Sequence, residues 1–246
     1  MAEFKLPTET VELPSKGLLY PENSPLASGT IEMKYMTAKE EDILTNTNYI
    51  QKGIVIDKLL ESLIVTPGVD YNQLLVGDKN AIMIAARILS YGKDYTVQYA
   101  GEEVTVDLST LSSKEVDYSQ YTERKNEFYF TLPASEVKIT FKLLTHGDEE
   151  AIDKEKESLK KINKESATEV TTRLKHTFTS VNGSTEQKDI RGFIDNYLLA
   201  RDARAFREYY NFLSPDVNLT FKYTGSTGVE EDVDLPIGLN FFWPDA

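Results

Sequence analysis

The chain has 246 residues, of which 40% are hydrophobic and 27% charged, so it can form one large core or two smaller ones and is not a disordered chain. Its formal net charge of −13 argues against a protein that grips the phosphate backbone of nucleic acids, which requires clustered Lys and Arg. The absence of cysteine excludes disulfides, thiolate zinc sites and cysteine nucleophiles, and no run approaches the roughly 20 apolar residues that cross a membrane.

Residues 1–29 are predicted to form an N-terminal arm, extended and weakly held up to about Thr10, followed by an ordered loop. In this loop Pro14, Gly17 and Pro21 bracket apolar side chains and exclude a helix. The apolar side chains dock either on their own domain or on a partner protein. The candidate contact residues of the loop are Leu13, Pro14, Lys16, Gly17, Leu18 and Tyr20.

Residues 30–108 are predicted to form a first unit of a strand, three helices and a hairpin. Thr37 followed by Glu40 matches a capping box, in which the two residues satisfy free amides at a helix start, so a helix should begin here. The following segments show apolar spacing typical of helices and then the alternation of hairpin strands. The expected elements are a strand at 31–35, a helical stripe at 56–64, a buried helix at 81–89 and hairpin strands at 95–99 and 104–108.

Residues 109–126 carry few aliphatic side chains and are predicted to link the first unit to a second, which spans residues 127–246. Apolar side chains at helical spacing predict one helix over residues 170–181. Alternating apolar residues predict a hairpin near each end of this unit. The expected elements are a hairpin at 128–143, helices that begin near 148, 170 and 190, and a hairpin at 217–237.

The order of elements in the first unit returns in the second. Thr145 followed by Asp148 repeats the capping pattern of Thr37 and Glu40, with further acidic residues after each cap. A hairpin closes each unit. The predicted fold class is therefore α+β, with two related units that each pack helices with antiparallel β-hairpins and that derive from an internal duplication.

Residue types that often carry chemistry form no constellation in this sequence. His146 and His176, the only histidines, have no metal-ligand spacing, and a role at the surface or at the edge of a core is expected for both. The densest basic cluster is Arg201, Arg204 and Arg207, but acidic neighbours dilute it, so we expect a structural or interface role rather than nucleic-acid binding. No catalytic residue, cofactor-binding residue or metal ligand is predicted.

The C-terminal end is rich in aromatic side chains, whereas chain ends are usually polar. Phe241, Phe242 and Trp243, which is the only tryptophan, lie close together there. They must be covered either by the second unit or by a groove on a partner, because aromatic clusters also mark interfaces. These three residues therefore join the candidate contact residues.

Four stretches of the sequence carry a family likeness. They are Leu-Pro-Ser-Lys-Gly-Leu-Leu-Tyr-Pro at 13–21, Met-Thr-Ala-Lys-Glu-Glu-Asp-Ile-Leu at 36–44, Asp-Lys-Asn at 78–80 leading into Ala-Arg-Ile-Leu-Ser-Tyr-Gly at 86–92, and Asn-Phe-Phe-Trp-Pro at 240–244. These stretches resemble the baseplate proteins of T-even-like contractile-tailed bacteriophages, and in particular their baseplate hub subunits and hub assembly proteins. The resemblance covers essentially the whole chain.

The resemblance implies a non-enzymatic protein that helps to build the baseplate hub in the host cytoplasm, through contacts with other tail and baseplate hub proteins. It leaves two roles open: a structural protein that stays in the virion, and a transient assembly chaperone that is absent from the mature virion. It also leaves the oligomeric state open. An enzyme is a third reading, but no nucleophile, base and orienting group can be named. Many relatives carry paired cysteines in the first hairpin, suggestive of a zinc ribbon, whereas residues 95–108 have none. We therefore expect no cofactor, and no nucleic acid or membrane as a partner.

Overall fold

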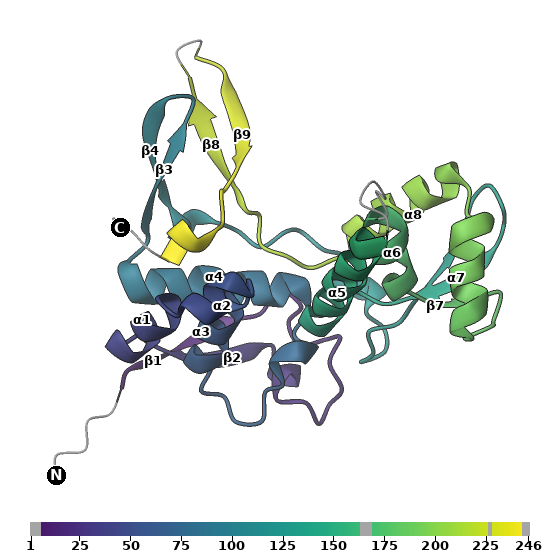
Figure 1. The fold of residues 1–246 in the computed structure, drawn as a ribbon, viewed down its shortest axis with the longest axis horizontal. Helices are drawn as coiled ribbons and strands as arrows, with labels where there is room; N and C mark the ends of the chain where they lie inside the picture. Colours follow the sequence, from purple (N-terminus) through teal and green to yellow (C-terminus); the bar gives the residue numbers. More distant parts are fainter. Residues whose placement is uncertain (1–5, 163–168, 226–227, 243–246) are drawn as a thin grey trace.

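The computed structural model describes residues 6–162, 169–225 and 228–242, which form two lobes (Figure 1). The mixture of helices with small antiparallel sheets confirms the predicted α+β class. The elements of the first lobe are β1 (Thr8–Glu12), β2 (Thr30–Lys34), α1 (Ala38–Leu44), α2 (Thr47–Gln51), α3 (Val55–Leu63), α4 (Val76–Tyr91), β3 (Asp94–Tyr99), β4 (Glu102–Asp107), β8 (Thr220–Thr224) and β9 (Glu230–Asp234). Those of the second lobe are β5 (Phe128–Thr131), β6 (Lys138–Phe141), α5 (His146–Ile162), α6 (Glu169–Thr177), β7 (Phe178–Val181), α7 (Gln187–Asn196) and α8 (Ala200–Leu213).

Helix α4 is the buried centre of the first lobe, as its apolar run predicts. It lies between helices α1 to α3 with strands β1 and β2 on one side and two hairpins on the other (Figure 1). The one charged residue of the predicted segment, Arg87, is also buried. Its guanidinium donates hydrogen bonds to the carbonyl oxygens of Gly92 and Asp94, at 2.9 and 3.2 Å, and so ties the helix end to the start of β3.

Three local predictions were wrong. Residues Thr8–Glu12 are not a loose arm but form β1, paired antiparallel with β2. The first predicted helix is divided into α1 and α2, because the Asn46 side chain accepts the amide hydrogens of the residues that begin α2. The helix predicted over residues 170–181 ends at Thr177 and gives way to β7, since its last four residues, Phe-Thr-Ser-Val, alternate sides and pair with β6.

The capping box predicted at Thr37 is present, and a lysine joins it. The Thr37 amide donates to Glu40 Oε2 at 3.0 Å, and Lys34 Nζ lies 2.7 Å from Glu40 Oε1. Burial opposes the charge of Glu40, but hydrogen bonds from Lys34 and Thr37 outweigh it and lower the pKa of Glu40 to about 2. The carboxylate therefore joins the end of β2 to the start of α1.

The second lobe repeats this arrangement at the junction of β6 and α5. The Thr145 amide donates to Asp148 Oδ2 at 3.1 Å, and the Asp148 amide donates to Thr145 Oγ1 at 3.3 Å. Lys142 Nζ lies 2.7 Å from Asp148 Oδ1, as Lys34 lies from Glu40. Three equivalent residues thus make equivalent contacts, which supports the predicted duplication, although overall identity between the halves is low.

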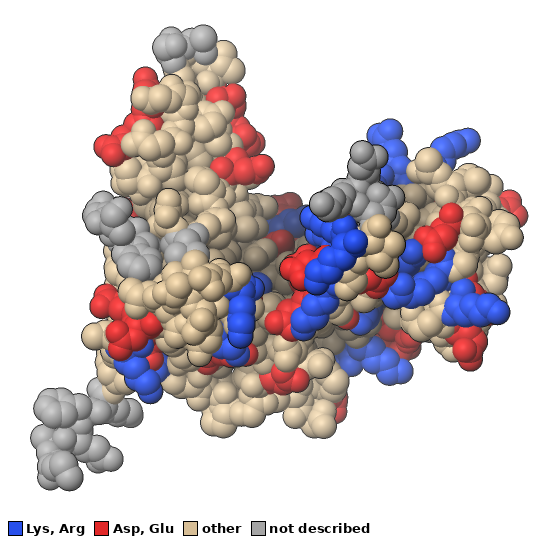
Figure 2. Space-filling view, viewed as in Figure 1, with Lys and Arg blue, Asp and Glu red and all other residues tan. Residues whose placement is uncertain are grey.

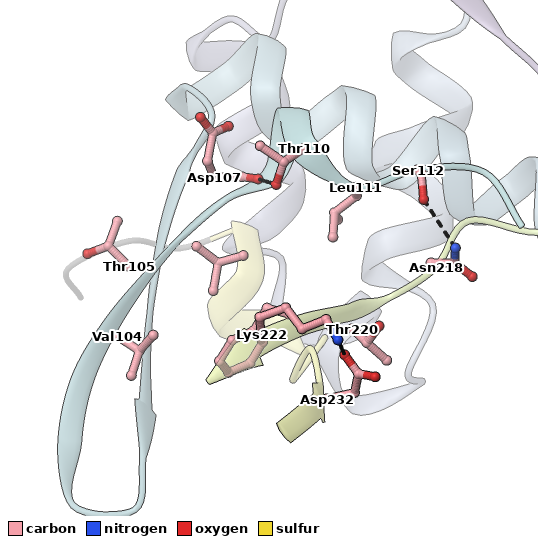
Figure 3. A pocket seen from close by; sticks show the side chains of 12 residues that line it. Val104, Thr105, Asp107, Thr110, Leu111, Ser112, Asn218, Thr220, Lys222 and Asp232 are labelled. Carbon is pink, nitrogen blue, oxygen red and sulfur yellow. Dashed lines mark hydrogen bonds and ion pairs between the residues drawn. The ribbon is translucent and has the colours of Figure 1, made fainter. Parts of the chain in front are cut away.

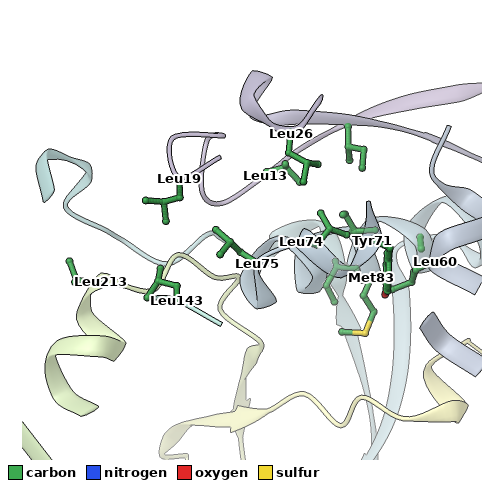
Figure 4. Close-up of a cluster of buried hydrophobic side chains, with 14 of the residues drawn as sticks. Leu13, Leu19, Leu26, Leu60, Tyr71, Leu74, Leu75, Met83, Leu143 and Leu213 are labelled. Atoms are coloured by element: carbon green, nitrogen blue, oxygen red, sulfur yellow. The ribbon is translucent and has the colours of Figure 1, made fainter. Parts of the chain in front are cut away.

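The two lobes share one continuous hydrophobic core. Leu143 and Leu213 of the second lobe belong to the same buried cluster as Leu19 and Leu75 of the first (Figure 4). The backbone also joins the lobes, since the Val76 amide donates to the Leu144 carbonyl at 3.1 Å. The predicted division into separate domains stays a prediction, and the buried cluster runs across this junction.

The predicted linker, residues 109–126, packs against both lobes. Tyr118 donates its phenolic hydrogen to the Pro14 carbonyl at 2.9 Å, and Tyr121 donates to the Leu213 carbonyl at 2.5 Å. Tyr121 is buried. The segment therefore fixes the lobes against each other rather than acting as a flexible tether.

Candidate interaction surfaces

The proline-bracketed loop is held down by one buried carboxylate, that of Asp78 near the start of α4. Asp78 accepts the Ser15 amide at 2.9 Å, the Ser15 hydroxyl at 2.7 Å and the Tyr20 hydroxyl at 2.6 Å. Burial raises the pKa of Asp78, and these three donors act against that rise. The Tyr20 oxygen also accepts the Leu75 amide at 2.9 Å. The loop therefore docks on its own domain, which was one of the two expected outcomes.

This docking decides which of the predicted loop residues face solvent. Leu13, Pro14, Gly17 and Tyr20 are buried and Leu18 is half-buried. Lys16 is exposed, and its ammonium lies 3.9 Å from the centre of the Tyr118 ring. A contact role for the loop stays a prediction, and in this conformation Lys16 is the residue best placed to fulfil it.

The C-terminal aromatic residues pack on the first lobe. Phe241 and Phe242 are fully buried, and the Phe241 ring lies edge-on to Tyr95 of β3, with 4.9 Å between centroids. Their short 3-10 helix also contacts α4. The expectation that they cover the second unit was therefore wrong, because β8 and β9 carry the chain back across the first lobe (Figure 1). Trp243 lies outside the described residues, so its predicted contact role stays a prediction.

The hairpins β3–β4 and β8–β9 pack on each other and project from the first lobe as a single twin-hairpin arm, residues 94–107 and 220–234 (Figure 1). The Tyr99 ring lies edge-on to Tyr223 at 4.9 Å and contacts Phe221 at 6.2 Å. Their hydroxyls cross between hairpins, with Tyr99 donating to Glu231 at 3.1 Å and Tyr223 donating to Glu102 at 3.2 Å. Aromatic contacts thus join two hairpins that are more than 110 residues apart in sequence.

A groove of about 640 Å³ lies between β4 and β8 at the base of the arm (Figure 3). One wall is β4, the other is β8, and Leu111 belongs to the lining between them. The lining residues are Val104, Thr105, Val106, Asp107, Thr110, Leu111, Ser112, Asn218, Thr220, Phe221, Lys222 and Asp232. The groove thus combines apolar side chains with two strands that each have only one partner in their sheets.

The free edge of β8 faces this groove. Leu235 donates its amide hydrogen to the Leu219 carbonyl, so odd-numbered residues of β8 bond to β9 and even-numbered ones point away from it. Just before β8, the outward-pointing Asn218 amide donates to the Ser112 carbonyl at 2.8 Å, within a short antiparallel bridge of Ser113 with Val217. That pairing stops where β8 begins, and Thr220 and Lys222 continue along the same edge.

The arm is strongly acidic. Together with Lys93 at its base, the arm contains eight Asp and Glu residues and two Lys residues, a net charge of −6 out of −13 for the whole chain. The charged side chains visible on the arm in this view are acidic, while the second lobe shows both signs (Figure 2). Both lysines are already paired, Lys93 with Asp107 at 2.6 Å and Lys222 with Asp232 at 2.9 Å. The arm therefore carries a negative electrostatic potential over its surface.

The model of a protein family described as T4 bacteriophage base plate protein matches residues 7–243 of the chain. The chain belongs to this family. No curated protein and no solved structure matches it. The match covers both lobes and the arm, so the whole described fold is that of a T4-like phage baseplate protein, whose role involves contacts with other phage proteins.

The histidines of this baseplate protein belong to separate polar clusters. His146 Nδ1 lies 3.2 Å from Lys79 Nζ, and Lys79 is paired with Asp57 at 3.0 Å. His176 Nε2 instead lies 2.9 Å from Glu155, which also binds Arg191. Within the described ranges no three His, Asp or Glu side chains gather as they would around a metal ion. The two clusters tie helices together, and neither brings the two histidines into one site.

The exposed face of α8 carries the basic cluster noted in the sequence. Arg201, Arg204 and Arg207 are exposed, and Arg204 pairs with Glu208 at 2.9 Å. Tyr209 and Tyr210 turn inward, where Tyr210 accepts the Leu144 amide through its hydroxyl.

None of the helices in the described part of the chain is long and apolar enough to cross a membrane.

Local sequence patterns do not indicate the residues that make the twin-hairpin arm a surface. Both hairpins were predicted, but local alternation indicates only the pairing within a hairpin and says nothing of a second hairpin far along the chain. Once the pairing of β8 with β9 is known, the alternation of an antiparallel pair gives the residues of β8 whose backbone groups point outward. The segment 112–114 that occupies part of this edge has no strand pattern in the sequence.

Proposed function

We propose that this baseplate-family protein acts in the baseplate hub, as a structural or assembly protein that binds other hub proteins. The observation that supports this role best is the twin-hairpin arm, which projects from the first lobe and exposes strand edges and acidic side chains (Figures 1 and 2). Solvent-exposed strand edges that stay unpaired within a chain are common sites of protein–protein contact. We propose the arm, and not the buried loop or the buried aromatic residues, as the main contact surface.

Complementation of a phage that lacks this gene tests the role. With the gene absent, we expect tails without complete baseplates in electron micrographs, and wild-type protein should restore them. Tyr223→Ala should restore them less well, because it removes the ring that joins the two hairpins. Tyr197→Ala is the matched control, since this tyrosine is exposed and lies at the end of α7 in the second lobe. Normal baseplates in the absence of the gene would refute the proposal.

The transient chaperone is the alternative role, because a baseplate-family protein can act before the particle is complete. Mass spectrometry of purified virions separates the two. A fixed copy number per particle supports the structural role, whereas presence in infected cells and absence from virions supports the chaperone. In either case we propose that the protein works in the host cytoplasm during assembly and that it is not an enzyme.

A further inference from the structure

One edge of β8 continues a short stretch of strand pairing within the chain. Segment 112–114 pairs with residues 216–218, and this pairing stops where β8 begins. The outward-pointing residues of this edge are Asp216, Asn218, Thr220 and Lys222, in the order of the chain. The first two are bonded, since the Lys114 amide donates to the Asp216 carbonyl at 2.8 Å and the Asn218 amide donates to the Ser112 carbonyl at 2.8 Å. Thr220 and Lys222 line the groove instead. The next rungs of the ladder therefore open onto solvent.

The opposite wall of the groove offers a second edge of the same kind. Leu108 donates its amide hydrogen to the Lys93 carbonyl at 2.8 Å, so the even-numbered residues of β4 bond to β3. Thr105 and Asp107 therefore point their backbone groups away from β3, and both line the groove. On this wall the Asp107 carbonyl already accepts the Thr110 hydroxyl at 2.7 Å, so an extended chain in the groove would find its longer free edge on β8.

We propose that the groove between β4 and β8 binds a short, extended, positively charged segment of another baseplate protein, which pairs with the vacant edge of β8 as an added strand. This inference rests on the proposed function, since it names how the arm would hold its partner. The groove has the length of a short strand, because its lining runs from Thr220 to Lys222 on β8 and from Val104 to Asp107 on β4.

Charge and apolar lining define the chemistry of the segment. Side chains of an added strand alternate between two faces. One face would meet Leu111 and Phe221 in the groove, which favours apolar residues such as valine. The other would lie within the field of an arm of charge −6, in which Glu230 and Glu231 are exposed, and this favours Lys or Arg. Alternating basic and β-branched residues fit both faces.

Proline placed on either edge of the same hairpin gives matched variants. Thr220→Pro removes an amide hydrogen from the groove edge of β8 and leaves the bonds to β9 intact, since Thr220 does not bond across the hairpin. Asp234→Pro is the control, because Asp234 lies directly opposite Thr220 and points its amide to the outer edge of β9. Both variants place proline at a residue that does not bond across the hairpin, so a difference in peptide affinity between them reports on the groove.

The probe is a short synthetic peptide of alternating Lys and Val, with alternating Glu and Val as its control, titrated into the full-length protein. Backbone amide chemical shifts and amide hydrogen exchange give the readout. We expect the Lys–Val peptide to shift and protect the amides of Thr220 and Lys222, the Glu–Val peptide to leave them unchanged, and added salt to weaken binding. Thr220→Pro should lower the affinity by about tenfold or more, while Asp234→Pro stays near wild type.

Three results would overturn the inference. They are the absence of any binding by the Lys–Val peptide, equal affinity for the two proline variants, and protection that falls outside residues 220–224. The proposed hub function is judged separately by complementation, because normal rescue by the wild-type gene does not depend on how the peptide behaves. A failure of strand addition would thus leave the hub role standing, and the two failures are told apart by which of the two experiments gives the negative result.

Discussion

Asp78 of α4 and Asp202 of α8 hold equivalent places in the two lobes. Each is buried, and each accepts backbone amide hydrogens from the turn between the first two strands of its lobe. Asp78 accepts from Ser15 at 2.9 Å, and Asp202 accepts from Ala134 and Ser135 at 2.7 and 3.1 Å. Both turns follow a buried Leu and a Pro, and both helices begin with the pattern Leu-Leu-X-X-Asp. This shared contact and the capping patterns agree with the predicted internal duplication, which stays a prediction.

The two carboxylates are expected to carry much of the stability of their lobes. Asp78→Ala leaves the Ser15 amide and the Tyr20 hydroxyl without their acceptor in a buried site, and we expect it to lower the free energy of unfolding by about 2 to 4 kcal/mol. Asp202→Ala should have an effect of the same order. Chemical denaturation measures both, with the Asn variants as controls that keep one acceptor oxygen. Alanine variants as stable as the wild type would contradict this view of the turns.

Protonation of Glu40 should weaken the first lobe at low pH. Its pKa is about 2 in the folded protein, below the value of about 4.3 for an unperturbed Glu, so its contribution is present above pH ~4.3 and is lost as the pH falls toward 2. The full effect is about 2 to 3 kcal/mol. Urea denaturation across this range should show a steeper fall for the wild type than for Glu40→Gln. Parallel curves for the two proteins would mean that Glu40 is not the group responsible.

His146 should make the joint between the lobes sensitive to mild acid. The side chain is 4% exposed, and burial together with the nearby Lys79 lowers its pKa below the usual value. Asp57 and Glu150 also face it, at 3.8 and 3.9 Å, and act in the opposite direction. Because the unfolded chain takes up a proton near pH 6.5 more readily than the folded one, stability should fall as the pH drops below that value.

Melting temperatures measured on either side of pH 6.5 check this expectation. His146→Gln keeps a polar side chain that cannot be protonated, so its melting temperature should change less over the same interval. His176→Gln is the comparison variant, because His176 lies against Glu155 away from this joint. If His146→Gln leaves the pH dependence of the melting temperature unchanged, another group causes the loss of stability below pH 6.5.

Truncation of Phe241 should destabilise the first lobe and loosen the arm. The ring is fully buried against Tyr95, so Phe241→Ala should lower the free energy of unfolding by about 3 to 5 kcal/mol. Amide hydrogen exchange should also speed up in β3, which Tyr95 belongs to. Tyr197→Ala, at a side chain that is 71% exposed, should change stability by less than about 0.5 kcal/mol. A stable Phe241→Ala protein that no longer binds its partner would instead assign this aromatic residue to an interface.

Local patterns predicted most elements, because helix caps and strand alternation act over a few residues. The helix start at Thr37 and the hairpins 95–108 and 217–237 are examples, and all three are confirmed by the structure. Strand β7 was missed because Phe178 and Val181 fit helical spacing as well as a short strand, and only pairing with β6 decides between the two. Local secondary-structure propensity cannot distinguish a helix from a strand where pairing with a distant strand decides between them.

The candidate surfaces were harder to predict than the fold. Pro14, Tyr20 and Phe241 are candidate contact residues because apolar side chains in a loop or near a chain end must be buried against something. The sequence does not show whether they are buried within the protein or against a partner. In the structure it is internal for all three, through Asp78, α4 and β3. The exposed surface arises instead where two hairpins meet, which depends on contacts between Tyr99 and Tyr223 across more than 120 residues of chain.

The return of β8 and β9 to the first lobe has a consequence for the order of folding during synthesis. Residues 128–213, which form the second lobe, emerge from the ribosome before the segment 217–242 that completes the first. Until that segment arrives, one flank of α4 and the Tyr95 ring have no cover. The second lobe can therefore fold before the first lobe is complete. A ribosome that stalls between residues 213 and 217 would leave the first lobe incomplete and prone to aggregation.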